Sequence, residues 1–155
     1  MPVLLIKTPI GPLLLVSDGR ALTHVLPPQD ARVSSFLHGD TAPNALTRRA
    51  AVEIADYFAG TRCAFDLPIK AAGTPFCRRV WQALSAVPFG QTVTYGQLAA
   101  RIGLPNGKRA VGAAVGKNPL LLLIPCHRVV AENGLGGFLL GQEVKRTLLQ
   151  AESQR

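Results

Sequence analysis

Apolar and polar positions follow two different rhythms along this chain. In its first part, three short apolar runs, separated by turns rich in Gly, Pro and Asp, occupy residues 3–6, 13–16 and 22–26. Such runs are typical of strands joined by tight turns. Apolar residues then recur at helical spacing over residues 46–58, and the pattern stops at Gly60. We therefore predict a small antiparallel sheet followed by one helix.

The next helix is marked at both ends. Thr74 is a suitable N-cap, and Pro75 stands at the first helical position. Apolar residues recur at helical spacing up to Val87, after which Pro88-Phe89-Gly90 breaks the helix. Between the two regions, residues 64–72 are expected to form a strand and a linker.

Two shorter helices follow. Thr94 can cap a helix that runs to Ile102 and ends at Gly103-Leu104-Pro105, while Asn106 is expected to cap a helix over residues 107–116. Two short helices joined by a tight Gly-Pro turn predict a helix-turn-helix.

These elements add up to an α+β fold with two small domains. The N-terminal domain, residues 1–70, is a small antiparallel sheet with a helix. The C-terminal domain, residues 71–155, is mostly helical and contains the helix-turn-helix. A chain of 155 residues buries about 70% of its unfolded surface. Its 48% hydrophobic and 17% charged residues argue against disorder.

Composition also bears on location and metal binding. No apolar stretch approaches the roughly 20 residues of a membrane span, and residues 1–7 lack a basic leader, so we expect a cytoplasmic protein, nucleoid-associated if bacterial. The three cysteines, Cys63, Cys77 and Cys126, lack metal-ligand spacing with any histidine. We expect reduced thiols, no metal, and Cys63 and Cys77 as small core residues.

Charge is distributed unevenly. The net charge is +8, and residues 67–131 contain no Asp or Glu but eight Lys and Arg residues. The chain before Leu67 has six acidic and six basic residues. A long acid-free segment can be an ordinary solvated basic face, but it is also what a phosphate-backbone partner requires. We favour a nucleic-acid partner.

One segment combines a nucleophile with polar neighbours. The apolar run 120–124 ends at Pro125, which is followed by Cys126, His127 and Arg128. A buried run that must turn at proline places Cys126 at the rim of a core. His and Arg neighbours commonly lower the pKa of a thiol, so the segment indicates an activated sulfur nucleophile. Arg128 could stabilise the thiolate, contact phosphate or tie down the turn.

A series of short motifs follows in order along the second half of the chain: Gly73-Thr74-Pro75-Phe76, Val80-Trp81, Pro88-Phe89-Gly90, Thr94-Tyr95, Arg109-Ala110-Val111-Gly112, Asn118-Pro119 and Pro125-Cys126-His127-Arg128-Val129. In this order the motifs resemble those of the O6-alkylguanine-DNA alkyltransferases, over about half of the chain. The resemblance implies DNA repair by irreversible, single-turnover transfer of an alkyl group from O6-alkylguanine, with O4-alkylthymine as a further candidate substrate. It implies no cofactor, double-stranded DNA as the partner, and a monomer.

The resemblance also implies roles for individual residues. Cys126 is the nucleophile, His127 takes its proton, Glu152 orients the imidazole and Tyr95 donates a hydrogen bond to the base. By itself, Glu152 is expected at the surface and Tyr95 as a half-buried packing residue. Asn118 braces the active-site turn. The pocket is expected from Gly136, Gly137, Phe138, Leu139 and Leu140.

The helix over residues 107–116 is rich in small residues. Small residues allow this helix to pack tightly against another helix, and that can be their only role. Because the helix begins with basic residues, the small residues also suit insertion into a narrow groove. The resemblance implies the second role, with Arg109 replacing the extruded base. The DNA-binding residues expected beside it are Thr94, Lys108, Ala110, Gly112, Ala113 and Arg128.

The resemblance weakens after the cysteine. Where the family has a tyrosine, a small residue and two glycines, this chain has Phe138-Leu139-Leu140-Gly141. Leu139 and Leu140 could narrow the pocket or favour larger adducts. If they block it, a non-enzymatic alkylated-DNA binder that recruits other repair factors is the alternative. A helix-turn-helix regulator with a structural Cys-His pair and a thiol hydrolase are further alternatives, the hydrolase the weakest because no oxyanion loop is identifiable.

Overall fold

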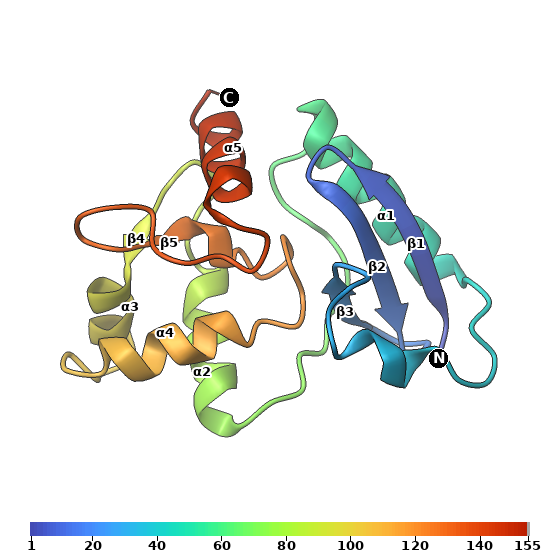
Figure 1. Cartoon of the computed structure of the whole chain (residues 1–155), viewed down its shortest axis with the longest axis horizontal. Coiled ribbons are helices and arrows are strands. Elements are labelled where there is room, and N and C mark those ends of the chain that lie inside the picture. The colour runs from blue at the N-terminus through green and yellow to red at the C-terminus, as the bar shows by residue number, and fades with distance from the viewer. Residues whose placement is uncertain (155) are drawn as a thin grey trace. The chain divides into compact units, whose positions relative to one another are not determined.

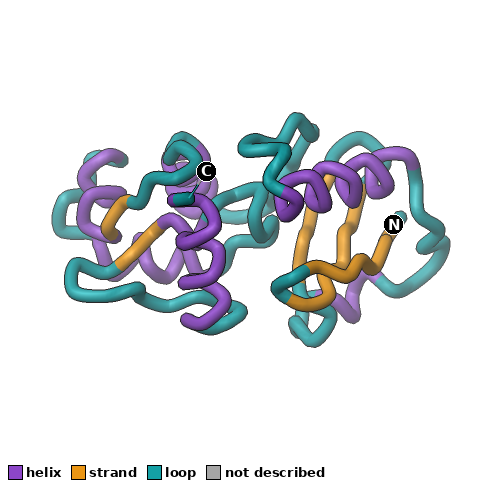
Figure 2. The backbone as a smooth tube through the Cα atoms, turned by 90° about the horizontal axis from the view of Figure 1, so that it is seen from above, coloured by secondary structure: helices purple, strands orange, loops and turns teal. Residues whose placement is uncertain are grey.

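The computed structural model describes residues 1–154. The chain folds into two compact units, Met1–Ala72 and Gly73–Arg155, each of which has its own secondary structure (Figures 1 and 2). The predicted α+β fold class, with a strand-rich first part and a mostly helical second part, is confirmed. No helix within residues 1–154 is long and apolar enough to cross a membrane.

A three-stranded antiparallel sheet forms the first unit. The strands β1 (Val3–Thr8), β2 (Gly11–Ser17) and β3 (Leu22–Leu26) lie in the order β1-β2-β3. The turn between β2 and β3 is closed by Asp18, whose Oδ1 accepts from the backbone N–H groups of Arg20 and Ala21 at 2.8 and 2.9 Å. The central strand β2 contributes the buried residues 13–16 to the core.

The helix α1 (Ala45–Ala59) packs against β1 and β2 (Figure 1). Its start is fixed by a capping box between Asn44 and Thr47, and Gly60 ends it with φ 86°. The helix predicted over 46–58 is thus confirmed. The strand expected within residues 64–72 is wrong, because only an isolated bridge joins Ile69 to Leu22.

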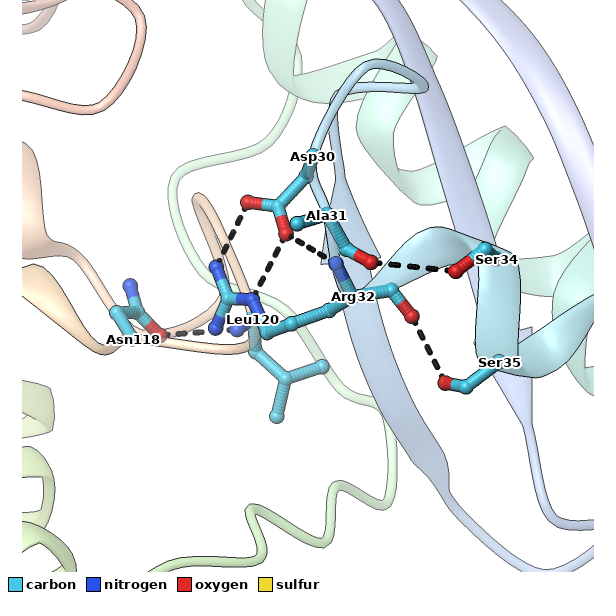
Figure 3. A network of polar contacts seen from close by, with 7 residues as sticks. All are labelled: Asp30, Ala31, Arg32, Ser34, Ser35, Asn118 and Leu120. Atoms are coloured by element: carbon cyan, nitrogen blue, oxygen red, sulfur yellow. Dashed lines mark hydrogen bonds and ion pairs between the residues drawn. The ribbon is translucent and has the colours of Figure 1, made fainter.

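The segment after β3 is held by local polar contacts (Figure 3). Arg32 donates from Nε and Nη2 to the two oxygens of Asp30, each at 3.0 Å. This guanidinium lowers the pKa of the Asp30 carboxyl. The hydroxyl groups of Ser34 and Ser35 donate to backbone carbonyls one turn earlier and so stabilise the short helix η1 (Val33–Phe36).

Helices dominate the second unit. α2 (Pro75–Ser85) begins as predicted, with the Thr74 side chain accepting from the Cys77 N–H. The indole N–H of Trp81 donates to the Ala114 carbonyl of α4 (Lys108–Gly116) at 2.9 Å, which joins these two helices. The unit also contains the short parallel strands β4 (Val93–Thr94) and β5 (Val129–Val130), the helix α3 (Tyr95–Arg101), the turn η2 (Cys126–Arg128) and the helix α5 (Gln142–Ser153).

The helix-turn-helix is formed by α3 and α4 (Figure 1). Thr94 caps α3 through a capping box with Gln97, as predicted from the sequence. The predicted Asn106 cap is wrong by one residue, because Gly107 is the N-cap and α4 begins at Lys108. A Cβ on residue 107 would lie 3.1 Å from the Leu104 carbonyl oxygen, so the tight turn favours glycine there.

Candidate active site

The thiol of Cys126 lies at the edge of an apolar core. The run before it, residues 120–124, is buried at four of five positions, and Leu122 adopts a left-handed conformation, φ 70°, where the run turns. Pro125 then leads into η2. Cys126 is 6% exposed and lines a pocket of about 220 Å³. This is the rim position that the sequence indicates.

Asn118 holds the turn that carries the thiol. Its Oδ1 accepts from the Leu120 N–H at 2.9 Å, as Figure 3 shows. Its Nδ2 donates to the Ile124 carbonyl at 2.8 Å. Burial raises the pKa of the Cys126 thiol, and a hydrogen bond with the same Asn118 side chain opposes part of that rise. The structure therefore places Asn118 where a brace of the active-site turn is expected.

A buried polar network begins at the residue after the thiol in sequence. The His127 Nε2 is 2.7 Å from Glu152 Oε2, and both side chains are 1% exposed. Arg128 donates to the same carboxylate at 2.9 and 3.2 Å, and to the Val87 carbonyl at 2.9 Å. Glu152 comes from α5, so the fold brings together residues that lie 24 and 25 positions apart.

The network leaves one nitrogen of His127 available. Burial lowers the pKa of the imidazole, and the hydrogen bond to Glu152 opposes that shift. A neutral ring that donates from Nε2 to the carboxylate carries a lone pair on Nδ1. Among residues 1–154 this buried Nδ1 has no hydrogen-bond partner. His127 can therefore accept a proton at Nδ1.

Two groups of the site differ from what the sequence suggests. Arg128 is 8% exposed, and its guanidinium is held by Glu152 and Val87, so the structure favours tying down the turn over contact with DNA phosphate. The thiol pKa is not lowered. Burial raises the pKa of Cys126 to about 11, because desolvation disfavours the thiolate more than its neighbours favour it.

Tyr95 forms a wall of the pocket. Its ring packs against two glycines: a Cβ on Gly112 would be 3.7 Å from the ring, and one on Gly136 would be 3.0 Å from it and 3.1 Å from the hydroxyl. Burial raises the pKa of the phenol, and a hydrogen bond with the Gly137 backbone opposes this. Tyr95 is therefore a protonated, half-buried donor at the pocket.

The loop before α5 supplies part of the pocket. Gly137, Phe138 and Leu139 line it, with Leu139 49% exposed. Gly136 contacts the ring of Tyr95 instead, and Leu140 is not among the lining residues. The two leucines therefore leave the pocket open. The remaining lining comes from Gly112, Val115, Gly116, Asn118 and Leu121.

The start of α4 carries exposed basic and small residues. Lys108, Arg109, Ala110 and Ala113 are exposed, whereas Gly112 and Thr94 are half-buried. A second pocket, of about 290 Å³, is lined by residues that include Lys108, Arg109 and Glu132 and shares Tyr95 and Gly112 with the first. Of the predicted DNA-binding residues, Gly112 thus lines both pockets, and Lys108 and Arg109 line the second one.

One buried group was missed by sequence reasoning. Lys145 of α5 is 0% exposed, and its Nζ donates to the carbonyls of Val129 at 2.5 Å and Gly137 at 3.0 Å. A signal existed in the sequence, because residues 145, 148 and 152 share one helical face, on which two of three members are charged. Cys63 also departs from expectation: it is exposed, while Cys77 is buried as predicted.

Within the described residues 1–154, no group of three or more His, Cys, Asp or Glu side chains is arranged to hold a metal ion. All three cysteines are free thiols.

Two family models together match nearly all of the chain. Residues 3–71 match the ribonuclease-like domain of 6-O-methylguanine DNA methyltransferase, and residues 75–154 match the DNA-binding domain of the same family. Methylated-DNA–protein-cysteine methyltransferases of Mycobacterium tuberculosis and Salmonella typhimurium are 40% and 41% identical to the chain. The alignments cover 97% and 95% of this chain and 91% and 92% of those proteins.

Solved structures show the same similarity. The M. tuberculosis O6-methylguanine methyltransferase superposes with a TM-score of 0.91 at 39% identity, covering 99% of this chain and 93% of that one. A Methanococcus jannaschii O6-methylguanine DNA methyltransferase superposes with a TM-score of 0.72 at 29% identity, covering 98% and 94%. The chain therefore belongs to the 6-O-methylguanine DNA methyltransferase family, and its activity is methylated-DNA–protein-cysteine methyl transfer, a DNA repair reaction.

Proposed function

We propose that Cys126 is the alkyl acceptor and that the substrate is double-stranded DNA carrying O6-alkylguanine. One observation carries this assignment: Cys126 is the thiol that lines an open pocket, and it adjoins the buried His127–Glu152 pair in sequence. The M. tuberculosis relative has been crystallised in complex with DNA, which supports a DNA partner for this chain. O4-alkylthymine is a second substrate to be tested.

The reaction can be written with the groups of this site. The sulfur of Cys126 attacks the alkyl carbon, an S–C bond forms, and the C–O6 bond breaks with its electron pair going to the guanine. His127 Nδ1 takes the thiol proton, directly or through water, while Glu152 holds the ring. The Tyr95 hydroxyl donates a hydrogen bond to the departing base.

The raised thiol pKa determines which steps can supply the rate of alkyl transfer. With a pKa of about 11, only about one thiol in ten thousand is ionised at pH 7. Proton removal by His127 must therefore accompany attack, and the pocket must hold the alkyl carbon in line with the sulfur. Since the thioether product has no ready route back to the thiol, each molecule reacts once.

The face beside the pocket suits a duplex. We infer that α4 enters a DNA groove and that Arg109 fills the space of the extruded nucleotide, because Lys108 and Arg109 are exposed and line the pocket that shares Tyr95 and Gly112 with the thiol pocket. Extruding a base costs a few kcal/mol, which phosphate contacts from the basic unit can offset. No cofactor is required for this step.

The alternative of a non-enzymatic lesion binder required a blocked pocket. Leu139 borders the opening and Leu140 is outside the lining, so the structure does not favour that alternative. We further propose that the chain acts as a monomer in the cytoplasm, on the nucleoid if bacterial. Its two domains are proposed to be residues 1–70 and 71–155, close to the bounds of the two compact units.

Intact-mass spectrometry tests the assignment of the acceptor. After incubation with methylated-guanine duplex, we expect one added methyl group, located at Cys126 by peptide mapping. Cys126→Ala should bind the duplex without reacting, while Cys77→Ala and Cys63→Ser should react like the wild type. Repeated turnover, or methylation at either of the other cysteines, would refute the proposal.

A further inference from the structure

One pocket of the second unit shares no residue with the site of the proposed reaction. It measures about 330 Å³, lies between α2 and the end of α3, and is lined by Arg79, Gln82, Ala83, Arg101 and Ile102. Neither the thiol pocket nor the pocket that contains Arg109 includes any of these residues. Arg79, Gln82 and Arg101 are exposed, so the pocket presents polar groups to solvent.

The guanidinium of Arg79 is held in a fixed direction. Its Nη2 donates to the Ile102 carbonyl, at the end of α3, at 2.5 Å. A cation at this position stabilises the end of a helix, and Arg101 in the last turn of α3 adds to that effect. The bond uses only one of the several N–H groups of a guanidinium, and among residues 1–154 the others have no partner. Helix capping therefore leaves most donors of Arg79 unused.

No acidic side chain balances these two arginines. The helices α2, α3 and α4 all lie within residues 67–131, which contain no Asp or Glu. Within the part of the chain that the structure describes, no carboxylate lies within 4.0 Å of either guanidinium. Arg79 is bonded to the residue that follows Arg101, so two like charges border one pocket and repel each other. An anion in the pocket would offset this repulsion.

A phosphodiester is the anion that these side chains suit. Arginine binds phosphate oxygens through paired N–H groups, and glutamine donates to them through its amide. Gln82 lies one helical turn after Arg79, so the two side chains share a face of α2. The helix α3 is the first helix of the helix-turn-helix, and in such motifs the first helix crosses the DNA backbone while the second enters a groove. The place of the pocket and its chemistry thus agree on a backbone phosphate.

We propose that Arg79, Gln82 and Arg101 form a binding site for one backbone phosphate of the duplex, separate from the thiol pocket. The inference rests on the proposed duplex substrate and adds a contact to it. Phosphate contacts fix the register and orientation of a protein on DNA and carry no sequence information. This site therefore holds the helix-turn-helix on the backbone while α4 occupies the groove. Reaction with free O6-alkylguanine does not use it.

The first test measures how affinity for unmodified duplex depends on salt. Arg79→Gln, Arg101→Gln and the double variant remove the charges of the pocket. Arg78→Gln is the matched control, because Arg78 is an exposed arginine of the same helix that does not line the pocket. Since both pocket arginines share one phosphate, the slope of log affinity against log salt concentration should fall by about 1 in the double variant. Arg78→Gln should keep the wild-type slope.

The second test locates the phosphate. Duplexes that carry a neutral methylphosphonate at one backbone position at a time are bound to the wild type and to the double variant. At one position the neutral group should weaken wild-type binding several-fold and leave binding of the double variant unchanged, because that variant has already lost the contact. At the other positions both proteins should lose affinity equally.

Three slope results contradict a shared phosphate site. They are an unchanged slope in the folded double variant, an equal fall in Arg78→Gln, and a fall of about 2, which indicates two separate phosphates. The inference is also overturned if no methylphosphonate position loses its effect in the double variant. If Arg79→Gln does not fold because the Ile102 carbonyl loses its donor, Arg101→Gln is tested alone. It must then lower the slope and reduce the effect of one methylphosphonate.

These binding measurements do not depend on alkyl transfer. If methylated duplex fails to alkylate Cys126 but the slope falls in the double variant, the proposed acceptor is wrong and the phosphate site stands. If the duplex alkylates Cys126 and the slope does not change, the proposed acceptor stands and the phosphate site is wrong.

Discussion

Each unit of this protein contains a buried glutamate held by arginine, and only one of the two belongs to the proposed active site. Glu53, on α1, is 5% exposed, lies 3.2 Å from Arg62 and 3.4 Å from Arg49, and accepts from the Asp66 N–H at 2.8 Å. Glu152, on α5, is 2% exposed and is paired with a buried arginine. Burial and ion pairing alone therefore do not mark function.

The difference lies in what else the carboxylate holds. Glu53 closes a loop through a backbone N–H, and its arginines are half-exposed. Glu152 instead binds an imidazole whose second nitrogen is buried and unpartnered within residues 1–154. An unused proton acceptor on the residue that follows the pocket thiol in sequence is what distinguishes the two sites.

The largest expected effect comes from neutralising each glutamate in turn. Glu152→Gln removes the charge that orients and stabilises a protonated His127, so alkyl transfer should slow by about 10²–10⁴-fold. Glu53→Gln should leave the rate per folded molecule unchanged. Its cost should appear as a loss of roughly 1–3 kcal/mol of unfolding free energy, less than for a fully buried pair, because its arginines are partly solvated.

Single-turnover kinetics and denaturant unfolding of both variants separate these outcomes. If Glu53→Gln slowed alkyl transfer as much as Glu152→Gln, the distinction between the two carboxylates would fail.

Removing a basic residue should slow repair less than Glu152→Gln does, and only when that residue lies in the second unit. Arg109→Ala should slow repair of methylated duplex by about 10- to 100-fold, since an unassisted extruded base costs a few kcal/mol, while reaction with free O6-alkylguanine changes little. Arg48→Ala, an exposed position on α1, is the control and should leave both rates unchanged. Equal losses on duplex and free base would remove the extrusion role of Arg109.

The pH dependence of the alkyl-transfer rate should report the protonation of His127. Because burial holds its pKa below 6.5, the imidazole is neutral and able to accept a proton at pH 7. The rate should stay level down to pH 6.5 and then fall by about tenfold per pH unit once the ring is protonated. The unfolded chain binds that proton near pH 6.5, so His127 also makes stability fall as pH drops below this value.

A rate measured on free O6-alkylguanine avoids the pH dependence of DNA binding. A fall that begins above pH 7 would contradict a neutral, buried base at this position.

The smallest effect concerns phosphate contacts. Lys108→Ala should reduce the slope of log affinity against log salt concentration by about 1, the loss of one phosphate contact. Arg128→Met should leave that slope unchanged and lower stability instead, because its guanidinium is inside the protein. A reduced slope in a folded Arg128→Met would restore the DNA-binding role that the structure argues against.

Local signals predicted the elements well. Thr74, Thr94 and Gly60 each end or begin a helix as expected, because capping depends on residues within one turn of the helix end. The thiol at the edge of the core also followed from a local pattern, an apolar run that meets a proline. The strand at 64–72 failed because strand pairing depends on a distant partner, and only Ile69 found one.

The electrostatics of the site could not be predicted from local patterns. Arg128 is buried because Val87, 41 residues earlier, and Glu152, 24 residues later, satisfy its N–H groups. The thiol pKa rises because the fold removes water around Cys126, which no neighbour in sequence reveals. Lys145 looks like an ordinary surface residue until β5 and the pocket loop supply its acceptors.

The bond between Trp81 and α4 gives this protein an optical probe of its own. The chain has a single tryptophan, Trp81. Its buried indole N–H donates a hydrogen bond to the Ala114 carbonyl of the helix that is proposed to enter DNA. Any displacement of that helix during base extrusion changes the polarity around one fluorophore. Stopped-flow emission on the unlabelled protein can therefore time the arrival of DNA separately from the chemistry at the sulfur.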